Sequence, residues 1–126
     1  MKRVTLVKLF VNDQDEALEF YTAKLGFVVA EDGKLGDYRW LLVRLPDNQE
    51  FALNFDVAKT DERRALVGRQ AADAPLFSIE TDDCMREYKT LKELGVEFEG
   101  EPDVQPYGTG ALMKDLYGNL IYINQD

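Results

Sequence analysis

The feature that most constrains the fold of this chain is an internal repeat. The segments DQDEALEFYTAKLGF (13–27) and DDCMREYKTLKELGV (82–96) align without a gap, 69 residues apart. The segments RWLLVRLPDNQEFALN (39–54) and TGALMKDLYGNLIYIN (109–124) align 70 residues apart. Sequence self-similarity at a fixed spacing indicates copies of one supersecondary unit. The chain is therefore expected to fold as two copies of the same unit.

The first copy begins with a strand and a helix. Apolar and polar residues alternate over Val4 to Val11, which is typical of a half-buried strand. Asp13 is followed three residues later by Glu16, a capping-box arrangement that predicts a helix from about Gln14 to Leu25. Gly26 is expected to end that helix, because glycine readily adopts the left-handed conformation found at helix C-termini.

The second copy repeats this order. Leu76 to Thr81 is the expected strand, Asp82 the helix N-cap and Gly95 the end of the helix. Three strands follow in each copy, beginning with Phe27 to Glu31 and with Val96 to Glu99. We therefore predict an α+β fold in which two tandem βαβββ modules form a curved mixed sheet around a cleft.

Module one is predicted at about residues 1–56 and module two at about residues 75–126 of a single domain. The polar segment between them, about residues 57–74, is expected to be a connector with a short helix at Asp61 to Val67. Tyr107 to Gly110 could form a mobile lip over the cleft or a plain connection between strands. The cleft itself is the expected location of function.

Composition excludes several classes of partner. Fifteen Lys and Arg against twenty-four Asp and Glu give a net charge of −9, which repels nucleic acid and anionic lipid. No apolar run reaches the ~18 residues of a membrane span. The single cysteine forbids an internal disulfide and fits a cytoplasmic location. The absence of histidine removes the commonest metal ligand and general base.

The order of motifs resembles the vicinal oxygen chelate superfamily, which includes glyoxalase I, extradiol dioxygenases, fosfomycin-resistance enzymes and bleomycin-resistance proteins. The resemblance covers the whole chain and includes a Gly-Asn turn similar to the Asp-Pro-Asp-Gly-Asn turn of the family. The segments that carry it are EFYTAKLGF (19–27), RWLLVRLP (39–46), KTLKELGVEF (89–98) and PYGTGALMKDLYGN (106–119).

The resemblance also implies which positions of the sequence would hold a metal. Family members with metal-dependent chemistry use side chains from the first and last strands of each module, typically His and Glu. Those positions fall here on Leu6, Leu76, Asn54 and Tyr122, with Ala52 in place of Asn54 if the register moves by two. Such side chains do not suit Zn²⁺, Mn²⁺ or Fe²⁺. We therefore predict no metal and no cofactor, as in the metal-free binding members.

Strand alternation gives the residues expected to line the cleft around a small organic ligand. These residues combine polar side chains with apolar ones. Trp40 and its neighbour Arg39 would suit a flat or anionic ligand. The predicted ligand-binding residues are Leu6, Lys8, Phe10, Arg39, Trp40, Asn54, Leu76, Ser78, Glu80, Tyr122 and Asn124.

Structural roles are open for several of these residues. Lys8 could simply pair with Glu80 across the first strands, and Tyr122 could be a core aromatic. Trp40 could fill the sheet core, since it and Arg39 point to opposite faces. Cys84 lies at the start of a helix but lacks a base to activate it, which argues against a reactive role.

Three functions remain open at this point. The leading one is a metal-free protein that binds a small molecule between its modules. The second is a lyase or dioxygenase of the same superfamily, with Glu80 or Tyr122 as a weak candidate acid or base. The third is an interaction module, and the resemblance implies a homodimer in every case.

Overall fold

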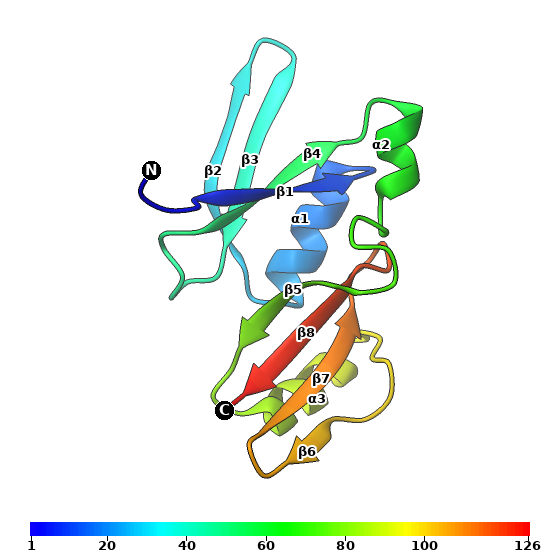
Figure 1. Ribbon diagram of the computed structural model, residues 1–126. Coiled ribbons are helices and arrows are strands. Elements are labelled where there is room, and N and C mark those ends of the chain that lie inside the picture. The colour runs from blue at the N-terminus through cyan, green and yellow to red at the C-terminus, as the bar shows by residue number, and fades with distance from the viewer. The chain divides into compact units, whose positions relative to one another are not determined.

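The computed structural model describes residues 1–126, and each half of the chain folds as a strand, a helix and three further strands (Figure 1). The division into two compact units falls between Val67 and Gly68. The predicted tandem βαβββ architecture is confirmed, and each unit has its own four-stranded mixed sheet. None of the three helices has the length and apolar character needed to cross a membrane.

Unit one places its first and last strands side by side. The strand order is β1-β4-β3-β2, with β1 parallel to β4 and the other neighbours antiparallel. A parallel neighbour requires a crossover, which α1 supplies. The elements are β1 (Leu6–Val11), α1 (Gln14–Ala23), β2 (Val28–Leu35), β3 (Tyr38–Arg44), β4 (Ala52–Val57) and the connecting helix α2 (Asp61–Leu66).

The core of unit one lies between α1 and one face of its sheet. Leu9, Val11 and Phe55 point toward the helix and are at most 1% exposed. The Tyr21 ring of α1 packs edge-on against Phe55 and Phe27, with centroid distances of 5.0 and 5.3 Å. Edge-to-face aromatic pairs add about 0.5–1.5 kcal/mol beyond their burial. This cluster fixes α1 on one face and leaves the other face of the sheet uncovered by that helix.

Unit two repeats the arrangement with the order β5-β8-β7-β6, and β5 is parallel to β8. Its helix packs on the face that carries Ile121, Ile123 and Met113, all at most 3% exposed. The Cys84 thiol at the start of the helix donates to the Ile123 carbonyl. The elements are β5 (Pro75–Glu80), α3 (Cys84–Glu93), β6 (Asp103–Gln105), β7 (Gly108–Lys114) and β8 (Leu120–Gln125).

The strand predicted at Val96 to Glu99 is wrong, because β7 is paired by two separate segments. The Glu99 amide and Glu97 carbonyl bond to the far end of β7, where Phe98 forms an isolated bridge. The chain then bends at Gly100, whose φ is +74°, before Pro102. Proline cannot donate to a ladder, so pairing resumes only at β6, beside the start of β7.

The cap of the second helix is also one residue later than predicted. The carboxylate of Asp83, rather than Asp82, accepts from the Arg86 amide, just as Asp13 accepts from Glu16. The helices therefore start 70 residues apart, although Gly26 and Gly95 are 69 apart. The turn after the helix is therefore one residue shorter in unit two than in unit one, although the sequence alignment shows no gap there.

A cap at Asp83 predicts that substitutions at Asp82 and Asp83 lower the free energy of unfolding by different amounts. Asp83→Ala should lower the free energy of unfolding by about 1 kcal/mol through loss of the cap. Asp82→Ala should change it by less than about 0.5 kcal/mol, as expected of an exposed position. Urea denaturation of both variants measures the difference, and a larger loss for Asp82→Ala would return the cap to that residue.

Candidate functional site

The candidate site is the open face of each sheet, meaning the face that the unit's own helix does not cover. In unit one, β1 and β4 pair so that Lys8 lies opposite Asn54 and Phe10 opposite Asp56. Because side chains alternate, these four share the open face with Leu6. The Arg63 guanidinium of α2 lies 5.6 Å from the centre of the Phe10 ring. The predicted lining residues of unit one's first and last strands are therefore brought together.

Lys8 forms an ion pair on this face that the sequence did not predict. Its Nζ lies 2.8 Å from the Asp56 carboxylate. The Asp56 side chain is 8% exposed, whereas the Lys8 side chain is 45% exposed. The signal that could have identified Asp56 is its spacing of two residues from Asn54 along the same strand. The pair presents a lysine ammonium on the open face, held in place by a buried carboxylate.

Asn54 is buried beside this pair with one oxygen unsatisfied. Its side-chain Nδ2 donates to the Leu41 carbonyl at 3.2 Å, but its Oδ1 has no hydrogen-bond partner. The residue is only 1% exposed. A buried acceptor without a donor costs about 1–3 kcal/mol. A donor on a bound molecule or water that reached this oxygen would recover part of that cost.

Trp40 and Arg39 lie on opposite faces of β3, as expected. The Trp40 indole donates to the Glu31 carboxylate on the neighbouring strand, toward the open face. This pair belongs to the β2–β3 hairpin, a long two-stranded arm of unit one (Figure 1). All eight residues of β2, the edge strand, are exposed. Trp40 is thus half-buried on the open face rather than in the core.

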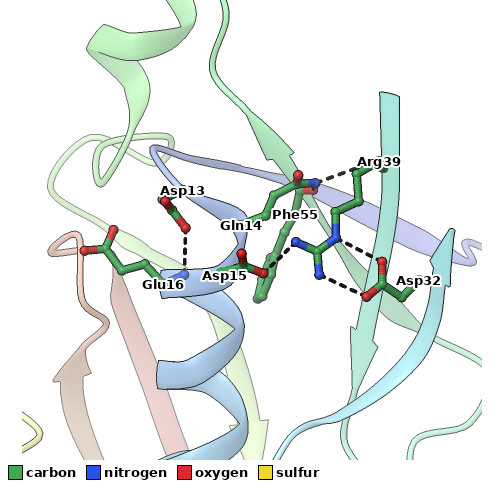
Figure 2. A network of polar contacts seen from close by, with 7 residues as sticks. All are labelled: Asp13, Gln14, Asp15, Glu16, Asp32, Arg39 and Phe55. Carbon is green, nitrogen blue, oxygen red and sulfur yellow. Dashed lines mark hydrogen bonds and ion pairs between the residues drawn. The ribbon is translucent and has the colours of Figure 1, made fainter. Parts of the chain in front are cut away.

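Arg39 instead joins the β2–β3 hairpin to α1 (Figure 2). Its guanidinium donates to both oxygens of Asp32 at 2.9 Å and to Asp15 at 2.7 Å. These bonds lower the pKa of Asp32 and raise that of Arg39. Gln14 adds bonds to the Arg39 and Phe55 carbonyls. The structure therefore places Arg39 on the helix side, with its charge already neutralised by carboxylates.

In unit two, the predicted residues of β5 and β8 share the open face. Ser78 lies opposite Tyr122 and Glu80 opposite Asn124. Leu76 sits at an irregularity in the ladder and is half-buried. Ser78 and Glu80 are exposed. The polar groups therefore gather at the end of the sheet where β5 and β8 finish.

The hydroxyl end of the Tyr122 ring lies against Gly110 of the neighbouring strand β7. A Cβ atom added to Gly110 would overlap the hydroxyl oxygen and the ring of Tyr122. Only glycine leaves this space, because it has no side chain. Tyr122 remains 37% exposed. It therefore forms a wall of the open face and is not a core aromatic.

A depression of about 190 Å³ lies beside this ring, entirely within unit two. Its polar lining includes Asp103 and Gln105 of β6, which sequence reasoning missed, together with Asn124. The predicted lip at Tyr107 to Gly110 contributes to the lining, but Gly108 to Gly110 belong to strand β7. The two glycines permit close approach of neighbouring groups, since a Cβ at Gly108 would press on the Gln125 carbonyl.

Comparison with known proteins identifies the family. The family model described as the glyoxalase/bleomycin resistance protein/dioxygenase superfamily matches residues 3–123. The chain belongs to this superfamily. The protein YurT of Bacillus subtilis (strain 168) is 37% identical, and the match covers 98% of both chains.

Solved structures agree with this assignment. The crystal structure of UcmS2 is 31% identical and has a TM-score of 0.86, covering 98% of both chains. TnmS3, an antibiotic binding protein from Streptomyces sp. CB03234, is 28% identical with a TM-score of 0.81. That match covers 99% of this chain and 96% of TnmS3.

The superfamily resemblance implies metal-ligand positions, and the registers identify them consistently in both units. Lys8, two residues after Leu6, lies opposite Asn54, and Ser78, two residues after Leu76, lies opposite Tyr122. Asn54 is therefore the counterpart of Tyr122, rather than Ala52. Two leucines, a buried amide and a phenol do not provide the imidazole and carboxylate donors that Zn²⁺, Mn²⁺ or Fe²⁺ prefer. The residues present do not fit a transition metal.

Cys84 is buried at the start of α3 and has no part in either open face. Burial raises the pKa of its thiol, and the nearby carboxylates of Asp83 and Glu87 raise it further. A raised pKa keeps the group in its thiol form, which is a poor nucleophile. The structure therefore gives Cys84 the character of an inert core residue.

The close contact between Tyr122 and Gly110 predicts that the effect of Gly110→Ala on stability changes sign when Tyr122 is removed. Gly110→Ala should destabilise the protein by about 1–3 kcal/mol, because the new methyl group displaces the ring. In a Tyr122→Ala background the same change should stabilise it by about 0.5 kcal/mol, because alanine is better than glycine inside a strand. Urea denaturation of the four proteins measures the coupling, and equal effects in both backgrounds would contradict the contact.

Proposed function

We propose that this protein binds a small organic molecule without a metal, holding it against the open faces of its sheets. The observation that carries the proposal is the Tyr122 ring. At a position where the family resemblance implies a metal-binding carboxylate, the chain has a phenol whose hydroxyl end lies against a glycine. The exposed ring offers a surface for stacking in place of a metal ligand.

The polar groups around this ring support the same function. The structure gives no hydrogen-bond partner to the Tyr122 hydroxyl or to the Asn124 side-chain amide, and both line the depression. Ligand sites typically combine apolar walls with a few such convergent polar groups. The description of TnmS3 as an antibiotic binding protein supports a binding role for this chain.

Unit one supplies a second set of polar groups, of which Lys8 is paired with Asp56 and Trp40 with Glu31. The Lys8 ammonium, the Trp40 indole and the unsatisfied Asn54 oxygen belong to its open face. Arg39, which the sequence suggested as a ligand contact, is left out of the proposal because it serves the junction with α1. Homodimer formation stays a prediction, as does the interaction-module alternative.

A thermal-shift screen with a library of natural-product antibiotics tests the proposal. A compound present at 100 times its Kd should stabilise the protein by about 2.7 kcal/mol. For a chain of this size that corresponds to a rise in Tm of roughly 8–15 °C. Failure of the library to give any stabilising compound would argue against a binding protein for this class of molecule.

Two variants test which face of the sheet in unit two binds the compound. Tyr122→Leu should remove most of the shift given by the best compound, because it removes the stacking surface. Val104→Ser is the control, since Val104 is an exposed apolar residue of β6 next to Asp103 and on the opposite face. A shift that survives Tyr122→Leu but is lost in Val104→Ser would place the compound on the wrong face.

A further inference from the structure

We propose that the depression beside Tyr122 is a subsite for a flat, positively charged group, such as one amine-bearing ring of a larger ligand. This inference rests on the proposed function and assigns the chemistry of one end of the bound molecule. Three features of the depression carry it: the ring, the charge of the lining and the size.

The ring provides a face for a cation. The hydroxyl end of the Tyr122 ring lies against Gly110, while the residue stays 37% exposed. The open side of an aromatic ring carries partial negative charge and attracts ammonium and guanidinium groups. A flat ligand ring can also stack there, because the underlying strand keeps the phenol in one orientation. The ring therefore favours a ligand group that is both flat and cationic.

The charge of the lining also favours a cationic group. The ionisable acids on it are Asp103 and Asp126, and no Lys or Arg lines the depression. Asp103 accepts from Gln105 through Oδ1 at 2.9 Å, which leaves Oδ2 for another donor. A protein with a net charge of −9 also attracts cations at a distance. An anionic group would meet repulsion from both carboxylates.

The register places the acceptors in one row. Asp103 lies opposite Gly110 on β7, and Gly110 lies opposite Asn124 on β8. The Tyr122 hydroxyl sits above Gly110, in the middle of this row. A carboxylate, a phenol oxygen and an amide oxygen therefore lie on one face across neighbouring strands, and each can accept from a cationic group bound there.

The size limits how much of a ligand can enter. At about 190 Å³ the depression is smaller than the roughly 300–1,000 Å³ of pockets that enclose a whole drug-sized molecule. It has room for one small ring system or a ring with its amine. The rest of a larger ligand would extend over the remainder of the open face of unit two.

Three indole probes that differ in charge test the subsite. Tryptamine, tryptophol and indole-3-acetate share one ring system and are cationic, neutral and anionic at neutral pH. Titration into ¹⁵N-labelled protein should shift the amide signals of Gly110, Tyr122 and Asn124. Tryptamine should bind roughly fivefold more tightly than tryptophol, as expected of a partly exposed ion pair and cation–π contact. Indole-3-acetate should bind most weakly.

Matched variants separate charge at the site from the overall charge. Asp103→Asn should bring the affinity for tryptamine to within about twofold of that for tryptophol. Asp73→Asn makes the same change of net charge at an exposed residue just before β5, at the opposite end of the sheet. It should leave the preference intact. Tyr122→Leu should weaken all three probes, and the amide spectra show whether each variant is folded.

The outcomes distinguish this inference from the proposed function. Equal affinities for the three probes, or an unchanged preference in Asp103→Asn, would overturn the cationic subsite. Shifts at Lys8 and Phe10 without charge preference would overturn it too, while leaving the proposed function standing. If neither the probes nor the antibiotic library affected any open-face residue, the proposed function would fail as well.

Discussion

The parallel pairing of the first and last strands in each unit determines where the functional groups lie. It brings β1 beside β4 and β5 beside β8, although 40 or more residues separate the paired positions. A shift of one residue would move every side chain to the other face. The observed register instead places Lys8 next to Asn54 and Ser78 next to Tyr122. The packing of each helix against the opposite face protects that register.

The sequence predicts the architecture because both copies have the same strand and helix signals. It misplaces elements where the copies differ in length. The connection between β3 and β4 spans residues 45–51, whereas that between β7 and β8 spans residues 115–119. This two-residue difference is why Asn54, rather than Ala52, is the counterpart of Tyr122. The bend at Gly100 likewise splits a strand that alternation alone would place at residues 96–99.

Alternation along the strands was also enough to place Lys8, Asn54 and Tyr122 on the open faces. It could not show Asp103, because the position of that residue depends on pairing between strands and not on spacing in one strand. The strand β6 is only three residues long and has no apolar pattern. The sequence suggests a ligand contact for Arg39 because this residue neighbours Trp40, whereas its carboxylate partners Asp15 and Asp32 are identified only by the packing of α1 and β2 beside β3.

The central claim is that ligand recognition depends on side chains of the open faces and needs no metal. The most direct test is calorimetric titration of the compound that gives the largest thermal shift, in metal-depleted buffer and in buffers supplemented with Zn²⁺, Mn²⁺ or Fe²⁺. The account predicts the same Kd in all four buffers within about twofold. Binding that occurs only when a metal is present would contradict it.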